Sequence, residues 1–349
     1  MKLLVTGGAG FIGSAVIRRA IGLGHHVLNL DILTYAANLA NVKTVSEDPR
    51  YSFARIDICD PAPLTRALSD FAPDAIIHLA AESHVDRSID SPASFIDTNI
   101  RGTFNVLQAA RSYLDARKSG TEFKFLHVST DEVFGSLPPD ANSMFTEDSS
   151  YAPRSPYSAS KAAADHLVRA WFSTYDLPTI VTNCSNNYGP YQFPEKLIPV
   201  TILNALHGSP IPVYGNGAQV RDWLHVEDHA DALLNVVVKG IAGKSYNIGA
   251  RCELRNIDLV HSVCAILDQK RPRKTGQYAE LIEFVRDRPG HDRRYAIDPS
   301  QTEKKLGWKA RTSINDGLES TVDWYLENEA WWQPLLQRDG VGARLGLLQ

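Results

Sequence analysis

The chain has 349 residues, enough for roughly two domains. It has the composition of an ordinary globular protein, with 44% hydrophobic and 22% charged residues. The formal net charge of -4 provides no basic field for nucleic acid or an anionic membrane, so a small-molecule substrate is the default expectation.

Segments for targeting, membrane insertion and metal binding are not indicated. The N-terminal MKLLVTGGAG passes directly into a strand and a glycine turn, so we expect no secretion signal. No apolar run approaches the roughly 18 residues of a membrane-spanning helix. The four cysteines show neither CxxC pairing nor histidines at zinc spacing. We therefore expect a cytoplasmic protein with reduced thiols and no metal.

From residue 1 to about 185, short apolar β-branched runs alternate with longer stretches of helical period. The runs are KLLVTG, HHVLNLD, DAIIHLA, FKFLHVS and PTIVTN, separated by segments such as GSAVIRRAIGLG and NIRGTFNVLQAARSYL. Strands that are apolar on both faces are typical of a parallel sheet covered by helices. The pattern predicts an α/β fold with a doubly wound parallel sheet.

The texture changes after about residue 186, where proline and glycine punctuate the chain. The segments DWLHVEDHADALLNVVVKG and KSYNIG indicate one more helix and strand that return to the first domain. We expect a Rossmann domain from residues 1–185 plus about 223–249. A second, smaller α/β domain is expected from about 186–222 plus 250–349.

The segment TGGAGFIGS places Gly8, Gly10 and Gly13 as GxGxxG between a strand and a helix. Such a turn lets backbone amides and the helix N-terminus meet a pyrophosphate. Asp31 ends the second strand at the spacing of a carboxylate that bonds a ribose diol, which favours NAD over NADP. Asp57, in ARIDICD, is predicted to close the third strand near the adenine.

The segment YSASK places Tyr157 and Lys161 on one face of a helix. An ammonium group beside a phenol favours the phenolate, so Lys161 is expected to lower the pKa of Tyr157 and make it a base. Ser129 and Thr130, at the end of an earlier strand, supply a partner hydroxyl.

Together with HLAA and STDEVFG, these motifs resemble the extended short-chain dehydrogenase/reductase family over nearly the whole chain. The resemblance implies that a nicotinamide oxidises a sugar nucleotide at C4, with Tyr157 as base and Lys161 holding the phenol and the nicotinamide ribose.

STDEVFG closely resembles the motif of one branch of that family, the dTDP-glucose 4,6-dehydratases. After C4 oxidation, water loss needs one base at C5 and one acid for the C6 hydroxyl. The resemblance implies that Glu132 is this base, Asp131 this acid, and Thr130 a hydrogen-bonding partner of the C4 oxygen. Adjacent strand residues point to opposite faces, so we predict that the strand ends by about Thr130.

The resemblance also implies the residues that hold the cofactor and the substrate. For NAD they are Gly7, Gly10, Phe11, Ile12, Gly13, Asp31, Thr34, Asp57, Ile58, Leu79, Ala80, Ala81, Thr98, Tyr157, Lys161 and Asn187. For dTDP-glucose they are Ser83, Thr130, Asn186, Lys196, Leu197, Pro212, Tyr214, Arg221, Asn256, Arg288 and His291. The cations among them, Lys196, Arg221 and Arg288, suit a diphosphate.

Three alternatives remain open at this point. The chain could be a UDP-sugar 4-epimerase, a UDP-glucose 4,6-dehydratase, or a noncatalytic NAD-binding regulator. Thymine and uracil differ by one methyl group, which a pocket distinguishes by only about 1–3 kcal/mol. The family resemblance implies a homodimer, for which NIRGTFNVLQAARSYL and AAADHLVRAWFSTY are the candidate interface helices.

Overall fold

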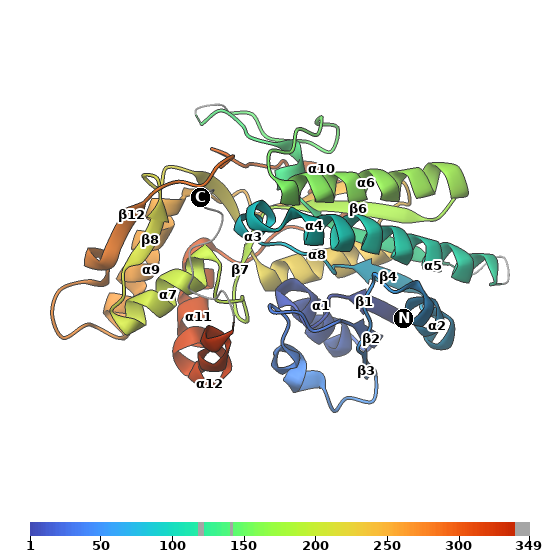
Figure 1. Cartoon of the computed structure of the whole chain (residues 1–349), viewed down its shortest axis with the longest axis horizontal. Helices are drawn as coiled ribbons and strands as arrows, with labels where there is room; N and C mark the ends of the chain where they lie inside the picture. Colours follow the sequence, from blue (N-terminus) through green and yellow to red (C-terminus); the bar gives the residue numbers. More distant parts are fainter. Residues whose placement is uncertain (118–121, 140–141, 339–349) are drawn as a thin grey trace.

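The computed structural model describes residues 1–117, 122–139 and 142–338. Its largest element is a seven-stranded sheet with the order β10-β6-β5-β4-β1-β2-β3, in which all neighbouring strands are parallel (Figure 1). The strands are β1 (Lys2–Thr6), β2 (His26–Leu30), β3 (Tyr51–Ala54), β4 (Ala75–His78), β5 (Lys124–Thr130), β6 (Thr179–Cys184) and β10 (Ser245–Ile248). The strand order reverses between β1 and β4, where such sheets open a ligand-binding crevice at their carboxyl ends. The predicted doubly wound sheet is confirmed.

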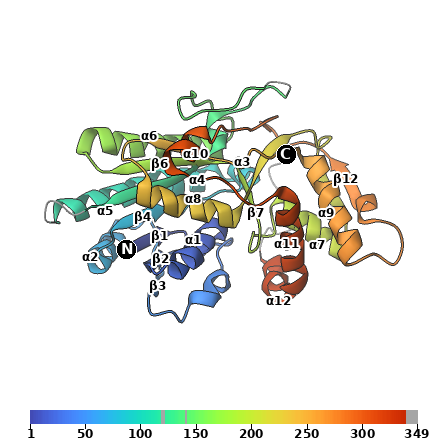
Figure 2. The same cartoon turned by 180° about the vertical axis from the view of Figure 1, so that it is seen from behind.

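Helices cover both faces of this sheet because its central strands are apolar on both faces. On β1, Leu3 and Val5 belong to one apolar core, while Leu4 between them belongs to another. The first core includes α1 (Phe11–Gly22) and α8 (Val226–Lys239), which pack against each other and stand in front of the sheet in Figure 2. The second core includes α2 (Pro61–Phe71), α5 (Thr103–Asp115) and α6 (Pro156–Tyr175).

A third core lies beside the main sheet, on the left in Figure 1. Its helices are α7 (Leu197–His207), α9 (Asn256–Lys270) and α11 (Ile314–Glu327). Two small sheets accompany them: β8 (Ile211–Tyr214) with β12 (Ile282–Val285), and β9 (Val220–His225) between β7 (Asn186–Tyr188) and β11 (Glu253–Arg255). Trp332 belongs to this core, and Leu335 is also buried.

Short elements complete the described part of the chain. They are η1 (Leu39–Val45), α3 (Val85–Asp90), α4 (Pro92–Phe95), the π-helical η2 (Ile96–Gly102), η3 (Asp131–Phe134), η4 (Tyr278–Leu281), α10 (Ser300–Leu306), α12 (Glu329–Trp332) and η5 (Gln333–Gln337). Among the described helices, none is both long and apolar enough to cross a membrane. The domain boundaries stay predictions, and the last residues assigned to the second domain, 339–349, lie outside the described ranges.

One predicted strand is shorter than expected. β3 ends at Ala54, so Asp57 does not close it. Asp57 instead accepts hydrogen bonds from the backbone N–H groups of Cys59 at its Oδ1 (2.8 Å) and of Asp60 at its carbonyl (3.0 Å). This turn leads directly into α2, whose N-cap is Asp60. The local side-chain bond of an aspartate therefore replaces further strand pairing at the sheet edge.

Candidate active site

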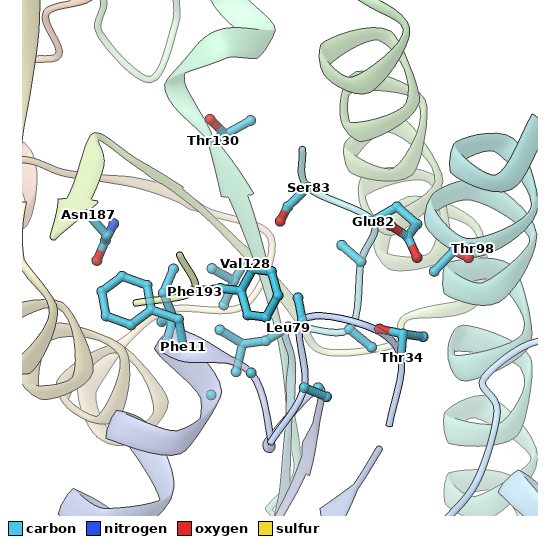
Figure 3. A pocket seen from close by; sticks show the side chains of 18 of the residues that line it. Phe11, Thr34, Leu79, Glu82, Ser83, Thr98, Val128, Thr130, Asn187 and Phe193 are labelled. Carbon is cyan, nitrogen blue, oxygen red and sulfur yellow. The ribbon is translucent and has the colours of Figure 1, made fainter. Parts of the chain in front are cut away.

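A cavity of about 380 Å³ opens at the carboxyl ends of the central strands, beside the glycine turn between β1 and α1. Every residue predicted to hold the cofactor lines it. Figure 3 shows Phe11 and Thr34 near the glycine turn and Thr130 at the end of β5, so the cavity runs from the first βα turn to the catalytic motif.

The glycines of the turn serve different purposes. Gly7 has a φ of +72°, and a Cβ there would lie 2.7 Å from the backbone N of Ala80. A Cβ on Gly13 would lie 2.2 Å from the carbonyl oxygen of Gly7, so this glycine is required by packing. A Cβ on Gly10 would meet only that same oxygen, at 3.2 Å, and is otherwise unobstructed. Gly10 therefore leaves the backbone open toward the cavity, as close approach of a diphosphate requires.

Asp31 joins the end of β2 to the glycine turn. Its Oδ2 accepts a hydrogen bond from the backbone N–H of Ala9 at 3.0 Å, and its Oδ1 accepts one from Leu33 at 2.7 Å. Burial raises the pKa of Asp31, although both backbone bonds act in the opposite direction. The carboxylate is thereby held rigidly at the cavity wall.

The acidic pair follows the end of β5, as predicted. The strand ends at Thr130, and Asp131 and Glu132 begin the 3-10 helix η3. Thr130 caps this helix, its Oγ1 accepting a hydrogen bond from the backbone N–H of Glu132 at 3.3 Å. The turn directs the two carboxyl groups differently: Glu132 lines the cavity, whereas Asp131 does not and is only 1% exposed.

Burial raises the pKa of both carboxyl groups, but their charged neighbours differ. Burial, followed by the charge of Glu132, raises the pKa of Asp131 well above its ordinary value. Its Oδ2 has no hydrogen-bond partner among the described residues. Burial also raises the pKa of Glu132, but the positive charges of Arg288, Arg221 and Lys196 oppose that rise. Asp131 is therefore the group that keeps a proton, and Glu132 the one that is more readily ionised.

Tyr157 and Lys161 lie on the same face of α6 and both line the cavity. The expected lowering of the tyrosine pKa is not met, because burial, with the negative charge of Glu132 next in importance, raises the pKa of Tyr157 well above its ordinary value. Lys161 is 5% exposed and its Nζ donates to the carbonyl oxygen of Val128 at 2.8 Å. The ammonium group is thus held from behind by β5.

Only part of the predicted substrate set lines the cavity, namely Ser83, Thr130, Asn186 and Lys196. Lys196 and Ser83 are joined across the lining, because Lys196 Nζ donates to the carbonyl oxygen of Ser83 at 3.1 Å. Asn186 has a buried Oδ1 without a partner among the described residues. The lining does not include Leu197, Pro212, Tyr214, Arg221, Asn256, Arg288 and His291.

Four of these outlying residues form a cluster beside Glu132. Arg288 Nη1 lies 2.8 Å from Asp86 Oδ1, and the hydroxyl of Tyr214 donates to Asp86 Oδ2 at 2.7 Å. The rings of Tyr214 and His291 meet edge to face with centroids 6.1 Å apart. Arg221 is 4% exposed, and its charge also acts on Glu132. The cluster therefore extends the site from the catalytic motif into the third core.

Several residues of the site were not predicted from the sequence. The cavity lining also contains Glu82, Cys184, Gln192, Phe193 and Glu195. Their only signal was adjacency, since Glu82 stands between Ala81 and Ser83, and Glu195 directly precedes Lys196. Asp86 was missed because its partner Arg288 is 202 positions away.

Known proteins resemble this chain over most of its length. The profile of a family described as GDP-mannose 4,6 dehydratase matches residues 4–321. The chain is 56% identical to the dTDP-glucose 4,6-dehydratase of Neisseria meningitidis serogroup B, covering 99% of each chain. It is 57% identical to the enzyme of that name from Salmonella typhimurium, covering 95% of this chain and 94% of the relative.

Solved structures show the same relation. The dTDP-glucose 4,6-dehydratase of Streptomyces venezuelae, solved with NAD bound, has a TM-score of 0.88 and 44% identity, covering 96% of this chain and 100% of that one. The UDP-glucose 4-epimerase of Thermus thermophilus, in complex with NAD, has a TM-score of 0.82 at 28% identity, covering 94% of this chain and 100% of that one. The fold is thus common to both activities, while the higher identities are to dehydratases.

Proposed function

The chain belongs to the nucleotide-sugar 4,6-dehydratase family of extended short-chain dehydrogenases, and on this premise we propose that it converts dTDP-glucose to dTDP-4-keto-6-deoxyglucose and water. The reaction consists of oxidation at C4, elimination of water across C5 and C6, and return of the hydride to C6. The observation that carries the proposal is the acidic pair after Thr130, in which the pKa of Asp131 is raised well above its ordinary value while nearby cations oppose the rise for Glu132.

The residues at the glycine turn fit NAD. Gly10 leaves the backbone accessible, the N-terminus of α1 faces the cavity, and the Asp31 carboxylate is fixed at the wall beyond it. A carboxylate at this place bonds a ribose diol and repels a 2′-phosphate, which favours NAD over NADP. The chemistry that NAD supplies when bound is acceptance of a hydride from C4 and its return to C6, so it is recycled in each turnover.

Tyr157 takes the proton from the C4 hydroxyl while Thr130 hydrogen-bonds the same oxygen. Because burial opposes the phenolate, Tyr157 depends on positive charge nearby, and Lys161 on the same helix face provides it. The hydrogen bond from Lys161 Nζ to the backbone carbonyl of Val128 keeps the ammonium group in position on the cavity side of β5.

Water loss requires two groups that act together. Glu132, which lines the cavity and whose charge is supported by Arg288 and Arg221, removes the C5 proton. Asp131, which keeps its proton because it is buried, donates it to the departing C6 hydroxyl. A 4-epimerase only rotates the ketone and returns the hydride. Its reaction contains no water loss, so it does not need a base at C5 and an acid at C6.

The diphosphate of the substrate is assigned to the cationic side of the site. Lys196 lines the cavity, and Arg288 and Arg221 lie toward the third core. Guanidinium groups match phosphate oxygens, and Arg288 would exchange its carboxylate partner Asp86 for phosphate. The remaining contacts to the sugar nucleotide are assigned to Ser83, Asn186, Leu197, Pro212, Tyr214, Asn256 and His291.

Mass spectrometry of the product tests this function. Purified protein is incubated with dTDP-glucose without added cofactor, and in parallel with UDP-glucose. We expect loss of one water from dTDP-glucose alone. Loss of water from UDP-glucose would identify a UDP-glucose dehydratase. Where the mass is unchanged, proton NMR of the recovered nucleotide sugar separates an epimerase, which changes the sugar configuration, from an NAD-binding regulator, which leaves the substrate unchanged.

We also propose a homodimer in the cytoplasm. α5 and α6 pack side by side and carry Phe104, which is 40% exposed and meets Trp171 edge to face at 5.8 Å. A second copy of this pair of helices would cover the aromatic surface. All four cysteines are free, which fits a reducing compartment.

A further inference from the structure

We propose that Asp165 is a positioning residue that serves as the buried counter-charge of Lys161, with His127 lying between the two. The inference rests on the proposed function for the role of Lys161, but the contacts that carry it are independent of any substrate. Neither Asp165 nor His127 lines the cavity. Both lie directly behind Lys161.

The three side chains form a continuous series inside the protein. Lys161 Nζ lies 3.5 Å from His127 Nε2, and His127 Nε2 in turn lies 3.1 Å from Asp165 Oδ1. The side chains of His127 and Asp165 are fully buried. Asp165 follows Lys161 by four residues and therefore stands one turn along the same face of α6. The helix and β5 thus bring one cation, one imidazole and one carboxylate together, and only Lys161 among them reaches the cavity.

A buried ammonium group needs such a partner. Removal from water favours neutral lysine, and only a nearby negative charge or hydrogen-bonded acceptor restores the charged form. The Val128 carbonyl provides one acceptor, but it carries no net charge. Burial lowers the pKa of Lys161, and Asp165 is the leading influence that opposes this.

The other groups around Lys161 and Tyr157 do not replace Asp165. They are His78 on β4, His127 on β5, Asp131 and Glu132 on η3, and Cys184 on β6. Burial lowers the pKa of His127 to about 4, so this imidazole is neutral near neutral pH. Burial raises the pKa of Cys184 to about 12, which keeps the thiol protonated. Asp131 and Glu132 are assigned to the elimination and change protonation during turnover.

Asp165 is built to remain ionised. Its Oδ2 accepts hydrogen bonds from the hydroxyl groups of Ser129 and Tyr151, each at 2.8 Å. These bonds, the contact with His127 and the charge of Lys161 outweigh burial, so the pKa of Asp165 is lowered. A carboxylate that served only to hold α6 against β5 would not need to keep its charge in a fully buried position.

A double-mutant cycle in thermal unfolding tests the pairing without substrate. Asp165→Asn is measured in the wild-type and in the Lys161→Met background. Tyr151→Phe is the control, because it removes the hydrogen bond to Asp165 and the one from Arg169 but leaves the charge of Asp165. We expect Asp165→Asn to lower the melting temperature clearly in the wild-type background and much less beside Lys161→Met. Tyr151→Phe should give the same shift in both. If Asp165→Asn alone does not fold, the double variant should recover folding; equal shifts, or no recovery, would overturn the proposal.

The pH dependence of cofactor reduction tests the functional consequence. Rates are followed by absorbance of the reduced nicotinamide after mixing holoenzyme with dTDP-glucose. In Asp165→Asn we expect Lys161 to lose its proton earlier, which moves the alkaline limb to lower pH by about one unit or more. Tyr151→Phe should leave that limb in place. A rate lowered equally at every pH would refute the coupling to Lys161. If the wild type itself does not react with dTDP-glucose, the proposed function fails, while the unfolding cycle still decides the role of Asp165.

Discussion

Replacing Asp131 with asparagine should stabilise the protein while removing its activity. The carboxyl group is 1% exposed, its Oδ2 has no hydrogen-bond partner among the described residues, and its pKa is raised well above the ordinary 3.8 by burial. Asparagine has the same shape and is neutral, so it imitates the protonated acid that the fold prefers. It cannot deliver the proton that water loss requires.

The magnitude follows from linkage. A folded carboxyl with a raised pKa binds a proton that the unfolded chain releases above about pH 4, so the free energy of unfolding falls as pH rises toward the folded pKa. For as long as folded Asp131 keeps its proton, binding that proton costs about 1.4 kcal/mol more for each pH unit above the unfolded pKa. Asp131→Asn removes this cost, so the excess of its free energy of unfolding over that of the wild type should grow with pH.

Urea unfolding of wild type and Asp131→Asn at matched NAD content, from pH 5 to pH 8, measures this difference. The titration of all other groups is common to both proteins and cancels. The same variant should still reduce the cofactor on addition of dTDP-glucose but lose water about 10²–10⁴-fold more slowly. A stability difference that does not change with pH, or a wild type that is the more stable at pH 7, would refute the assignment of Asp131 as a buried, protonated acid.

Three further predictions concern the base, the cofactor turn and the dimer. In stopped-flow absorbance, Glu132→Gln should still reduce bound NAD but slow water loss about 10²–10⁴-fold, whereas Tyr157→Phe should block both steps. Normal turnover by Glu132→Gln would refute the assignment of Glu132 as the base. Gly13→Ala places a methyl group 2.2 Å from the Gly7 carbonyl oxygen, so the purified variant should contain little NAD and be about 1–3 kcal/mol less stable; full NAD content would contradict the packing argument. Phe104→Glu should halve the mass found by light scattering, and an unchanged dimer would place the interface elsewhere.

Patterns of neighbouring residues in the sequence were sufficient to predict much of the fold and one part of the site. Strands β1, β2 and β5, the glycine turn and the covering helices follow from apolar runs, helical period and glycine spacing. Tyr157 and Lys161 share a face of α6 because four residues make about one turn. The end of β5 at Thr130 was predicted because two adjacent carboxylates cannot face one substrate from a regular strand.

The tertiary structure alone decided the charge state and the partners of these groups. A pKa depends on burial and on charges that approach from distant parts of the chain, and neither quantity is encoded in local spacing. Burial therefore reversed the expected direction for Tyr157, and it separated the roles of the adjacent Asp131 and Glu132. The tertiary structure also placed Asp165 against His127. In the sequence, nothing links this acidic residue of a helix with this histidine of an apolar strand. The sequence by itself determined which chemical groups stand at the ends of the strands, and folding determined which of them hold a proton.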